Sequence, residues 1–286
     1  MAGYAVFGRD PSRLIGLSDA AVRFYGISFG FFAQAQILLA GVVLAIYLVR
    51  RAGWRWLPAF VAVYGLSLGS ELMGTAYGVP FGPYSYTDLL GVKWLGLVPA
   101  LIPLSWFFMA VPAYGLAVRA LGGGGRPGAL GRAASESAGR AGALSRIALG
   151  SLLLLAWDLT LDPAMSEVTR YWVWGEAGPY YGMPLMNLFG WYVTGVVLMV
   201  VLEWRGARSW LGGASTAWLV GFYGANLILP LGMTLVAGMW GAAVATALVL
   251  GGVVVWASLR SRTRGGGRLE GGTGRREASS GAEVVR

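Results

Sequence analysis

Apolar residues along the chain gather in long blocks instead of alternating with polar residues. Seven blocks approach the roughly 20 residues that a helix needs to cross a hydrocarbon core. Because backbone polar groups in lipid must be paired within their own segment, we expect the blocks to be helices, and a β-barrel would require strict alternation. The pattern predicts an all-α, polytopic transmembrane bundle of about seven helices. The expected spans are residues 29–49, 56–73, 95–118, 147–161, 185–202, 214–231 and 234–259.

Basic residues mark one side of the predicted bundle. The segments after the first, third, fifth and seventh blocks are rich in arginine, whereas those after the second, fourth and sixth hold only Lys93 and Arg170 as basic residues. By the positive-inside rule the arginine-rich side is cytoplasmic, with the N-terminus outside and the C-terminus inside. The net charge of +9 therefore orients the chain and meets anionic lipid. With 56% hydrophobic and 12% charged residues, we expect an integral protein of a bacterial plasma membrane that binds no nucleic acid.

Composition along the chain divides it into three parts. In residues 1–28 charged residues interrupt the apolar stretches, which excludes a cleavable signal peptide and favours a segment at the membrane interface. Residues 29–259 form the transmembrane domain, which holds any catalytic site and includes a flexible cytoplasmic linker at 119–146. Residues 260–286 are rich in arginine and glycine and are expected to be a disordered cytoplasmic tail.

Two loops rich in aromatic residues, glycine and proline lie on the predicted non-cytoplasmic face, at residues 74–94 and 162–184. Each follows a helix that carries acidic residues, and both contain Gly-Pro-Tyr, at 82–84 and 178–180. A duplicated helix-loop-helix unit would leave this pattern. Loops of this length are seldom simple tethers, so we expect them to fold back as a lid over the bundle.

The absence of cysteine and histidine limits the possible chemistry. It excludes a thiolate nucleophile, a histidine base, haem on histidine or cysteine, and the usual zinc sites. We therefore expect no metal and no cofactor, and any catalysis must use carboxyl groups, hydroxyls, amides or aromatic faces.

Three acidic residues within or at the border of the spans are the candidate catalytic groups: Glu71, Asp158 and Asp162. An ionisable residue inside a membrane costs about 2.5–3.5 kcal/mol on insertion scales and is functional by default. Asp158 and Asp162 share one helix face, because they are four residues apart. Burial without a counter-charge favours the neutral carboxyl group, which can then donate a proton. Two structural roles compete: Asp162 before Pro163 is a common turn, and Glu71 could reach the interface.

Aromatic residues crowd both loops and their exits. An interfacial aromatic belt would explain them, as would a cleft for a long apolar ligand in which aromatic faces steady a developing cation. The density of glycine and proline favours the cleft. Asn187 and Asn226 could join helices or position water. The residues expected to bind substrate are Tyr77, Phe81, Tyr84, Trp94, Trp174, Tyr180, Tyr181, Asn187 and Trp191, and Tyr86, Tyr171, Trp172 and Tyr192 lie in the same regions.

Two long motifs surround the acidic residues. The first runs from Glu71 to Gly74 and from Gly78 to Tyr86, and continues through residues 97–99, 102–104 and 106. The second comprises residues 157–158, 161–163, 172–174, 178–184, 187 and 190–191. Together they resemble the CruF-type carotenoid biosynthesis proteins, membrane hydratases that add water across the terminal C1′=C2′ bond of a linear ψ-end carotenoid. The resemblance covers most of residues 55–230. It implies a carotenoid substrate, such as lycopene or γ-carotene, and makes other carotenoid biosynthesis enzymes candidate partners beside membrane lipid.

The chemistry of this reaction suits the residues present. Hydration of a trisubstituted alkene begins with protonation to a tertiary carbocation, which water then captures to give a tertiary alcohol. It needs a protonated carboxylic acid, aromatic faces beside the cation and a polar group that orients water. We expect Glu71 or Asp158 to donate the proton. Asp162 and Asn187 would hold the water, with Tyr180 or Tyr181 as a third polar neighbour.

The sequence is also compatible with two other functions. A membrane carotenoid cyclase or isomerase would use the same acids and aromatic residues but exclude water, so its product would have the mass of the substrate. A transporter would need a polar path through the bundle, and the cytoplasmic halves of the spans are nearly free of polar residues.

Overall fold

The computed structural model describes residues 1–8, 10–121 and 132–273, and the chain forms two compact units, Met1–Thr246 and Ala247–Arg286. Within the described residues, seven helices are long and apolar enough to cross a membrane. This confirms the predicted all-α polytopic bundle, and the chain is an integral membrane protein. The spans are Asp19–Ala52, Leu57–Tyr77, Leu101–Leu121, Gly139–Val168, Leu185–Trp204, Thr216–Val236 and Trp240–Arg260.

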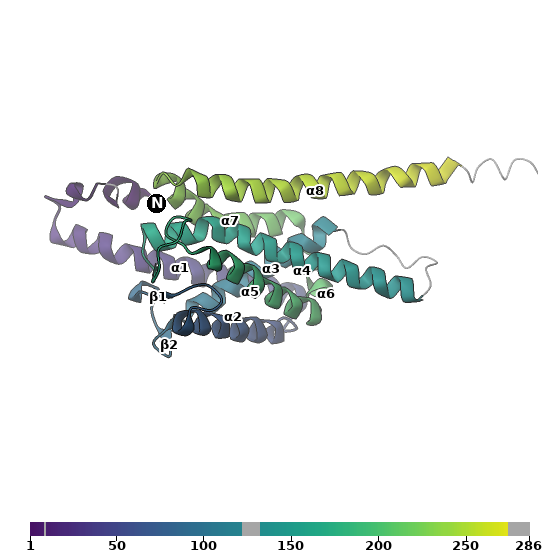
Figure 1. The fold of residues 1–286 in the computed structure, drawn as a ribbon, viewed down its shortest axis with the longest axis horizontal. Coiled ribbons are helices and arrows are strands. Elements are labelled where there is room, and N and C mark those ends of the chain that lie inside the picture. Colours follow the sequence, from purple (N-terminus) through teal and green to yellow (C-terminus); the bar gives the residue numbers. More distant parts are fainter. Residues whose placement is uncertain (9, 122–131, 274–286) are drawn as a thin grey trace, which may run out of the picture. The chain divides into compact units, whose positions relative to one another are not determined.

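The helices follow the chain in the order expected (Figure 1). A short π-helical turn, η1 (Tyr4–Gly8), and a 3₁₀ turn, η2 (Pro11–Leu14), precede the first long helix. A second π-helical turn, η4 (Ala164–Val168), continues α4. The α-helices are α1 (Asp19–Ala52), α2 (Leu57–Tyr77), α3 (Leu101–Leu121), α4 (Arg132–Pro163), α5 (Leu185–Trp204), α6 (Ala207–Leu211), α7 (Thr216–Val236) and α8 (Trp240–Thr273).

Several expected span boundaries differ from the helices, including the start of the seventh span, which is Trp240 because residue 234 still belongs to α7. Helix α1 starts at Asp19 instead of residue 29, because Ser18 caps it by accepting a hydrogen bond from the backbone N–H of Ala21. Helix α3 starts at Leu101 instead of residue 95. The preceding residues form a short hairpin in which β2 (Lys93–Trp94) pairs with β3 (Val98–Pro99), and Gly96 provides the positive φ of its turn.

The expected linker at 119–146 is partly helical, because α4 already begins at Arg132. Arg146 is buried within that helix, where its Nε donates to Glu203 Oε2 of α5 at 3.0 Å, and Tyr114 of α3 donates to the same carboxylate. Residues 122–131 of the linker lie outside the described residues. Helix α8 extends into the segment expected to be a disordered tail, as far as Thr273, and residues 274–286 are likewise outside the described residues.

Helix α3 is the buried centre of the first unit. It packs against α1, α2, α4, α5 and α7, and most of its residues are buried around its whole circumference. Large rings at Trp106 and Tyr114 alternate with small residues such as Ala110 and Ala113, which lets the neighbouring helices approach closely. A helix that is apolar on every side belongs in such a position.

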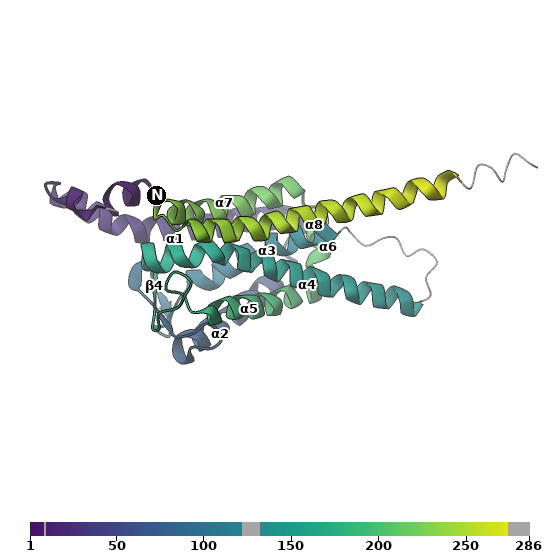
Figure 2. The same ribbon diagram turned by 45° about the horizontal axis from the view of Figure 1, so that its top comes forward.

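The two aromatic loops pair with each other. Strand β1 (Tyr84–Tyr86) of the first loop runs antiparallel to β4 (Trp172–Trp174) of the second, with Tyr84 opposite Trp174 and Tyr86 opposite Trp172. Side chains alternate along the strands, so Ser85 and Val173 are exposed while the rings on either side face the helices. The paired loops lie at the end of the bundle that holds the N-terminus (Figures 1 and 2). We call this the loop end.

Candidate functional site

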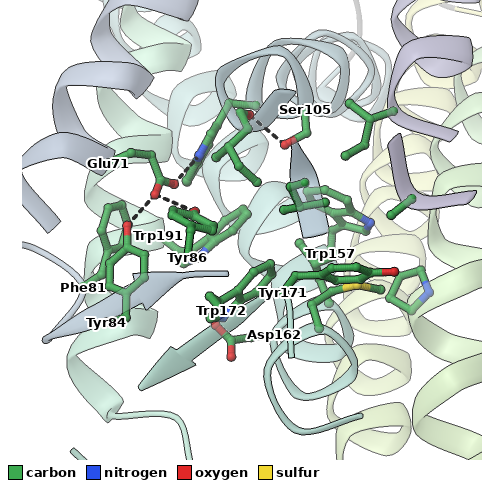
Figure 3. Close-up of a pocket in the computed structure, with 18 of the residues that line it drawn as sticks. Glu71, Phe81, Tyr84, Tyr86, Ser105, Trp157, Asp162, Tyr171, Trp172 and Trp191 are labelled. Carbon is green, nitrogen blue, oxygen red and sulfur yellow. Dashed lines mark hydrogen bonds between the residues drawn. The ribbon is translucent and has the colours of Figure 1, made fainter. Parts of the chain in front are cut away.

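A cavity of about 90 Å³ lies within the loop end of the bundle, bordered by the inner faces of β1 and β4 (Figure 3). Helices α1, α2, α3, α4, α5 and α7 all contribute to its wall. Most of the lining is aromatic or aliphatic, interrupted by two carboxyl groups and three amides. The lining includes Glu71, Phe81, Tyr84, Tyr86, Trp106, Trp157, Asp162, Trp172, Trp174, Asn187, Trp191 and Asn226.

Glu71 lies on α2 and is 4% exposed. Its Oε1 accepts a hydrogen bond of 2.8 Å from Trp106 Nε1, and its Oε2 accepts hydrogen bonds from the hydroxyls of Tyr86, at 2.8 Å, and Tyr84. Figure 3 shows the labelled Tyr84 and Tyr86 beside the carboxyl group of Glu71. Three donors satisfy a buried carboxylate without a cation, because each stabilises the negative charge.

The two tyrosines of β1 stay neutral over the physiological pH range. Burial raises the pKa of both the Tyr84 and Tyr86 hydroxyls well above the usual value, and the neighbouring Glu71 carboxylate adds to the shift. A phenol whose ionised form is disfavoured remains a hydrogen-bond donor. Strand β1 therefore supplies Glu71 with two lasting donors.

Asp158 and Asp162 lie one turn apart on α4 and are 0% and 2% exposed. The amide nitrogen of Asn187 on α5 is 3.1 Å from an oxygen of each, so one side chain bridges the two carboxyl groups. Asp162 Oδ1 also accepts hydrogen bonds of 3.1 Å from Trp174 Nε1 and Ser166 Oγ. Asp158 Oδ1 is buried and has no hydrogen-bond partner among the described residues.

Asp158 is thus less well provided with donors than either Asp162 or Glu71. The ion pairs that the described residues form, Arg13–Asp10, Lys93–Asp88 and Arg146–Glu203, involve none of the three acids at the cavity. Within the same part of the chain, no three or more acidic side chains gather as a metal site would require. Glu71 and Asp162 in the cavity wall, and Asp158 behind them, are therefore carboxyl groups held by neutral donors.

Aromatic rings form the rest of the wall. Trp106 and Trp191 are stacked with their ring centroids 4.0 Å apart, and Trp157 meets Trp191 edge to face at 6.0 Å. On the side of the loops, Tyr84 lies 5.3 Å from Trp174, and Figure 3 shows the labelled rings separating Glu71 from Asp162. Such faces can stabilise a cation that forms between them.

The structure brings most of the predicted site residues to this cavity. They come from α2, the first loop, α4, β4 and α5, and they are Glu71, Phe81, Tyr84, Asp162, Trp174, Asn187 and Trp191. Asp158 lies behind Asp162 and reaches the cavity only through Asn187.

Four predicted substrate-binding residues do not line the cavity. Tyr77 is 75% exposed at the end of α2. Trp94 lies on the β2–β3 hairpin, where its Nε1 donates to Tyr64 Oη at 2.9 Å. Tyr180 donates to the carbonyl of Leu159 at 2.8 Å, and burial raises its pKa well above the usual value. Tyr181 packs against Tyr180. The direct role in holding water that the sequence predicted for Tyr180 or Tyr181 is therefore not supported by their positions.

Six aromatic residues of the cavity wall were not among the predicted site residues: Tyr86, Trp106, Phe108, Trp157, Tyr171 and Trp172. Tyr86 could have been predicted from the sequence, because residues two apart on a strand face the same side and Tyr84 was already expected to bind substrate. Trp106 and Trp157 look like ordinary apolar residues of a span, and only the contact of Trp106 with Glu71 reveals a polar role.

Comparison with known proteins adds two findings. The family described as "Carotenoid biosynthesis protein" matches residues 32–254, which include every residue that lines the cavity. Bisanhydrobacterioruberin hydratase of Haloarcula japonica is 32% identical over 187 residues, which cover 65% of this chain and 56% of that protein. The chain therefore aligns with little more than half the length of this relative. No solved structure matches the chain.

Proposed function

Because the chain belongs to the carotenoid biosynthesis protein family, we propose that it is a carotenoid hydratase that adds water across the terminal C1′=C2′ bond of a ψ-end carotenoid of the lycopene or γ-carotene type. The observation that carries the proposal is a small cavity at the loop end, in which the carboxyl groups of Glu71 and Asp162 meet an aromatic wall and Asp158 lies behind Asp162. The similarity to a bisanhydrobacterioruberin hydratase supports hydration over other modifications of a carotenoid.

The aspartate pair is the proton donor in this proposal. Two buried carboxyl groups one turn apart are costly to charge together when no cation among the described residues pairs with them, so the pair retains a proton, although Trp174 and Ser166 also donate to Asp162. Asp162 lines the cavity and delivers this proton to C2′ of the alkene, and Asp158 behind it stabilises the protonated pair. The positive charge then develops at C1′, the more substituted carbon.

Glu71 is the partner of water. Its three donors favour the carboxylate, which can attract the tertiary cation and accept the proton of the attacking water molecule. The new C–O bond forms at C1′ as the proton passes from water to Glu71. Return of that proton to the aspartate pair completes the cycle, so the net reaction consumes one water and no other reagent. Trp106 and Trp191 contact the region between the two acids and steady the cation.

Product mass tests the proposed function directly. The full chain is expressed in cells that make lycopene or γ-carotene, and extracted carotenoids are analysed by mass spectrometry. A hydratase gives products heavier than the substrate by one or two water molecules, depending on whether one or both ends react. Products of unchanged mass but altered absorption would instead identify a cyclase or isomerase. Cells that carry an Asp162→Asn variant expressed to the same level give the background.

A further inference from the structure

A second, larger cavity of about 900 Å³ adjoins the site. Its walls come from η1, η2, the first half of α1, the η4 turn and α7. The lining is mostly apolar, with Phe7, Tyr25 and Phe29 in edge-to-face contact along one side at centroid distances of 5.6 and 5.1 Å. We call this cavity the apolar groove.

The apolar groove and the catalytic cavity are continuous. Five residues line both spaces: Ala33 and Gln36 of α1, Met165 of η4, Tyr171 just before β4, and Leu229 of α7. Gln36 is a polar residue in the middle of a span, faces this junction and has no hydrogen-bond partner within the part of the chain that the structure describes. A long ligand can therefore lie in both spaces at once.

The two helices that flank the groove touch at one end and part at the other. Away from the loop end, Tyr47 of α1 and Trp218 of α7 are stacked with centroids 3.5 Å apart. At the loop end the groove lies between the two helices, and the Tyr171 hydroxyl closes its floor by donating to the carbonyl of Phe29 at 2.8 Å. Large apolar side chains at the rim are exposed on the surface that would face lipid, with Phe24 at 69% and Leu39 at 64%.

The volumes of the catalytic cavity and the apolar groove indicate that they hold different parts of a ligand. A cavity of about 90 Å³ is smaller than the roughly 150 Å³ of an engineered cavity that binds benzene, so it has room only for the tip of a polyene. The ten-fold larger groove is needed for the body of the chain. An apolar chain placed there leaves the hydrocarbon core without entering water.

We propose that the apolar groove binds the conjugated chain of the carotenoid, which enters from the lipid between α1 and α7 and passes Gln36 to place its end beside Asp162. This inference rests on the proposed function for the identity of its ligand. It assigns a binding role to residues within 1–8 and 14–29, which lie outside the stretch that matches the family.

The substitution Ala35→Trp tests the groove, because Ala35 lines it and does not line the catalytic cavity. Val42→Trp is the control: Val42 lies on the same helix, is exposed, and lines neither space. Two quantities are measured, the lycopene that stays bound to purified protein and the KM for hydration. We expect Ala35→Trp to reduce retained lycopene, and to raise KM, by about ten-fold, the effect of losing roughly 1.4 kcal/mol of binding. Val42→Trp should match the wild type.

A second pair guards against misfolding of Ala35→Trp. Ala21 lines the groove near the start of α1, whereas its neighbour Ala20 does not. Ala21→Trp should weaken lycopene retention and Ala20→Trp should not. Equal retention in all four variants, or loss of a bound phospholipid with unchanged lycopene, would overturn the proposal.

A short terpene with the same dimethyl alkene end tests whether a variant impairs binding in the groove or the hydration reaction itself. It can occupy the catalytic cavity while leaving most of the groove empty, so Ala35→Trp should impair lycopene hydration at least about ten-fold more than hydration of the short terpene. Retention of lycopene by the wild type but not by Ala35→Trp, with no hydrated product from either, would contradict the proposed function and still support carotenoid binding in the groove. If hydration occurs but the variants impair both substrates equally, the proposed role of the groove is wrong and the proposed function is unaffected.

Discussion

The three carboxyl groups at the cavity differ in what surrounds them, and this difference distinguishes their roles. Glu71 accepts hydrogen bonds from Tyr84, Tyr86 and Trp106, which all stabilise its charged form. Asp158 accepts only from the Asn187 amide that it shares with Asp162, and its Oδ1 has no partner among the described residues, whereas Asp162 also accepts from Trp174 and Ser166. A buried group that lacks donors is better suited to carry a proton than to carry charge. The same local environment would suit any reaction that protonates an alkene, including cyclisation and isomerisation. Whether the cation becomes an alcohol then depends on whether water lies beside it.

Amide substitutions separate the two roles. Asp162→Asn keeps the volume of the side chain but removes the proton donor, so hydration should fall by roughly 10² or more. Glu71→Gln should slow hydration by a similar factor while protonation continues, because the aspartate pair is intact. In deuterated solvent, substrate recovered from Glu71→Gln should then contain deuterium, and substrate recovered from Asp162→Asn should not. Initial rates of alcohol formation and the deuterium content of the alkene are measured together.

The control for these variants is Glu176→Gln, the same change at an exposed acid of the second loop. It should leave both measurements at the wild-type level. Normal deuterium incorporation by Asp162→Asn would show that the aspartate is not the donor, and the assignment of roles would then have to be reversed or abandoned.

At the scale of elements, the site depends on how closely the first loop packs against α2 and α5. Phe81 and Tyr84 lie directly over Gly74 of α2, and Phe81 and the carbonyl of Pro80 lie over Gly190 of α5. A side chain at either glycine would occupy the space that the loop fills. Because β1 carries two of the three donors to Glu71, the position of the loop sets the geometry of the acid.

Gly190→Ala should therefore disturb the lid. A Cβ there would lie 2.6 Å from Phe81 and 2.7 Å from the Pro80 carbonyl oxygen, and relieving this overlap should cost roughly 1–3 kcal/mol. We expect a lower unfolding temperature in detergent and reduced hydration, because Phe81 and β1 move away from Glu71. Thermal unfolding and product formation are measured on the same preparation.

Gly65→Ala is the matched substitution on a helix surface, since a Cβ at this position of α2 meets no atom within 4 Å. Helix propensity predicts that it stabilises α2 by about 0.5–1 kcal/mol without affecting activity. Equal stability and activity of Gly190→Ala and Gly65→Ala would mean that the loop is not held as the structure shows.

At the scale of the whole molecule, the seven candidate spans among the described residues predict that the two termini of the membrane domain lie on opposite sides of the bilayer. The loops that form the lid follow the second and fourth spans, and the arginine-rich segments follow the first, third, fifth and seventh. If arginine marks the cytoplasm, the catalytic cavity lies near the outer leaflet. A carotenoid would then meet the enzyme in that half of the bilayer.

Reporter fusions test this orientation. Fusions at Gly128, outside the described residues, and after Arg264 should report the cytoplasm, and an accessible cysteine introduced at Glu176 should react with an impermeant reagent from outside. An external signal at Gly128 or Arg264 would contradict the positive-inside assignment. Comparing intact cells with inverted vesicles excludes a failure of the label itself.

The sequence alone determined the class of the protein and the number of its candidate spans, and it singled out Glu71 and Asp162, which line the cavity. These features are local, because the length of an apolar block and the cost of a carboxyl group inside it follow from the bilayer and from neighbouring residues. The family resemblance depended on motifs of the same local kind, and the family match confirms it. Span ends were less certain, as at Leu101, because a hairpin beside a helix can be as apolar as the helix.

Only the tertiary structure decided which aromatic residues meet the acids. Tyr77 and Tyr86 look alike in the sequence, yet one is exposed and the other donates to Glu71. Trp106 reaches Glu71 from another helix, and Asn187 reaches Asp158 from across the bundle. The pairing of β1 with β4 and the junction of the groove with the cavity likewise join segments far apart in the chain. Such contacts depend on helix packing and strand register, which no single stretch of sequence specifies.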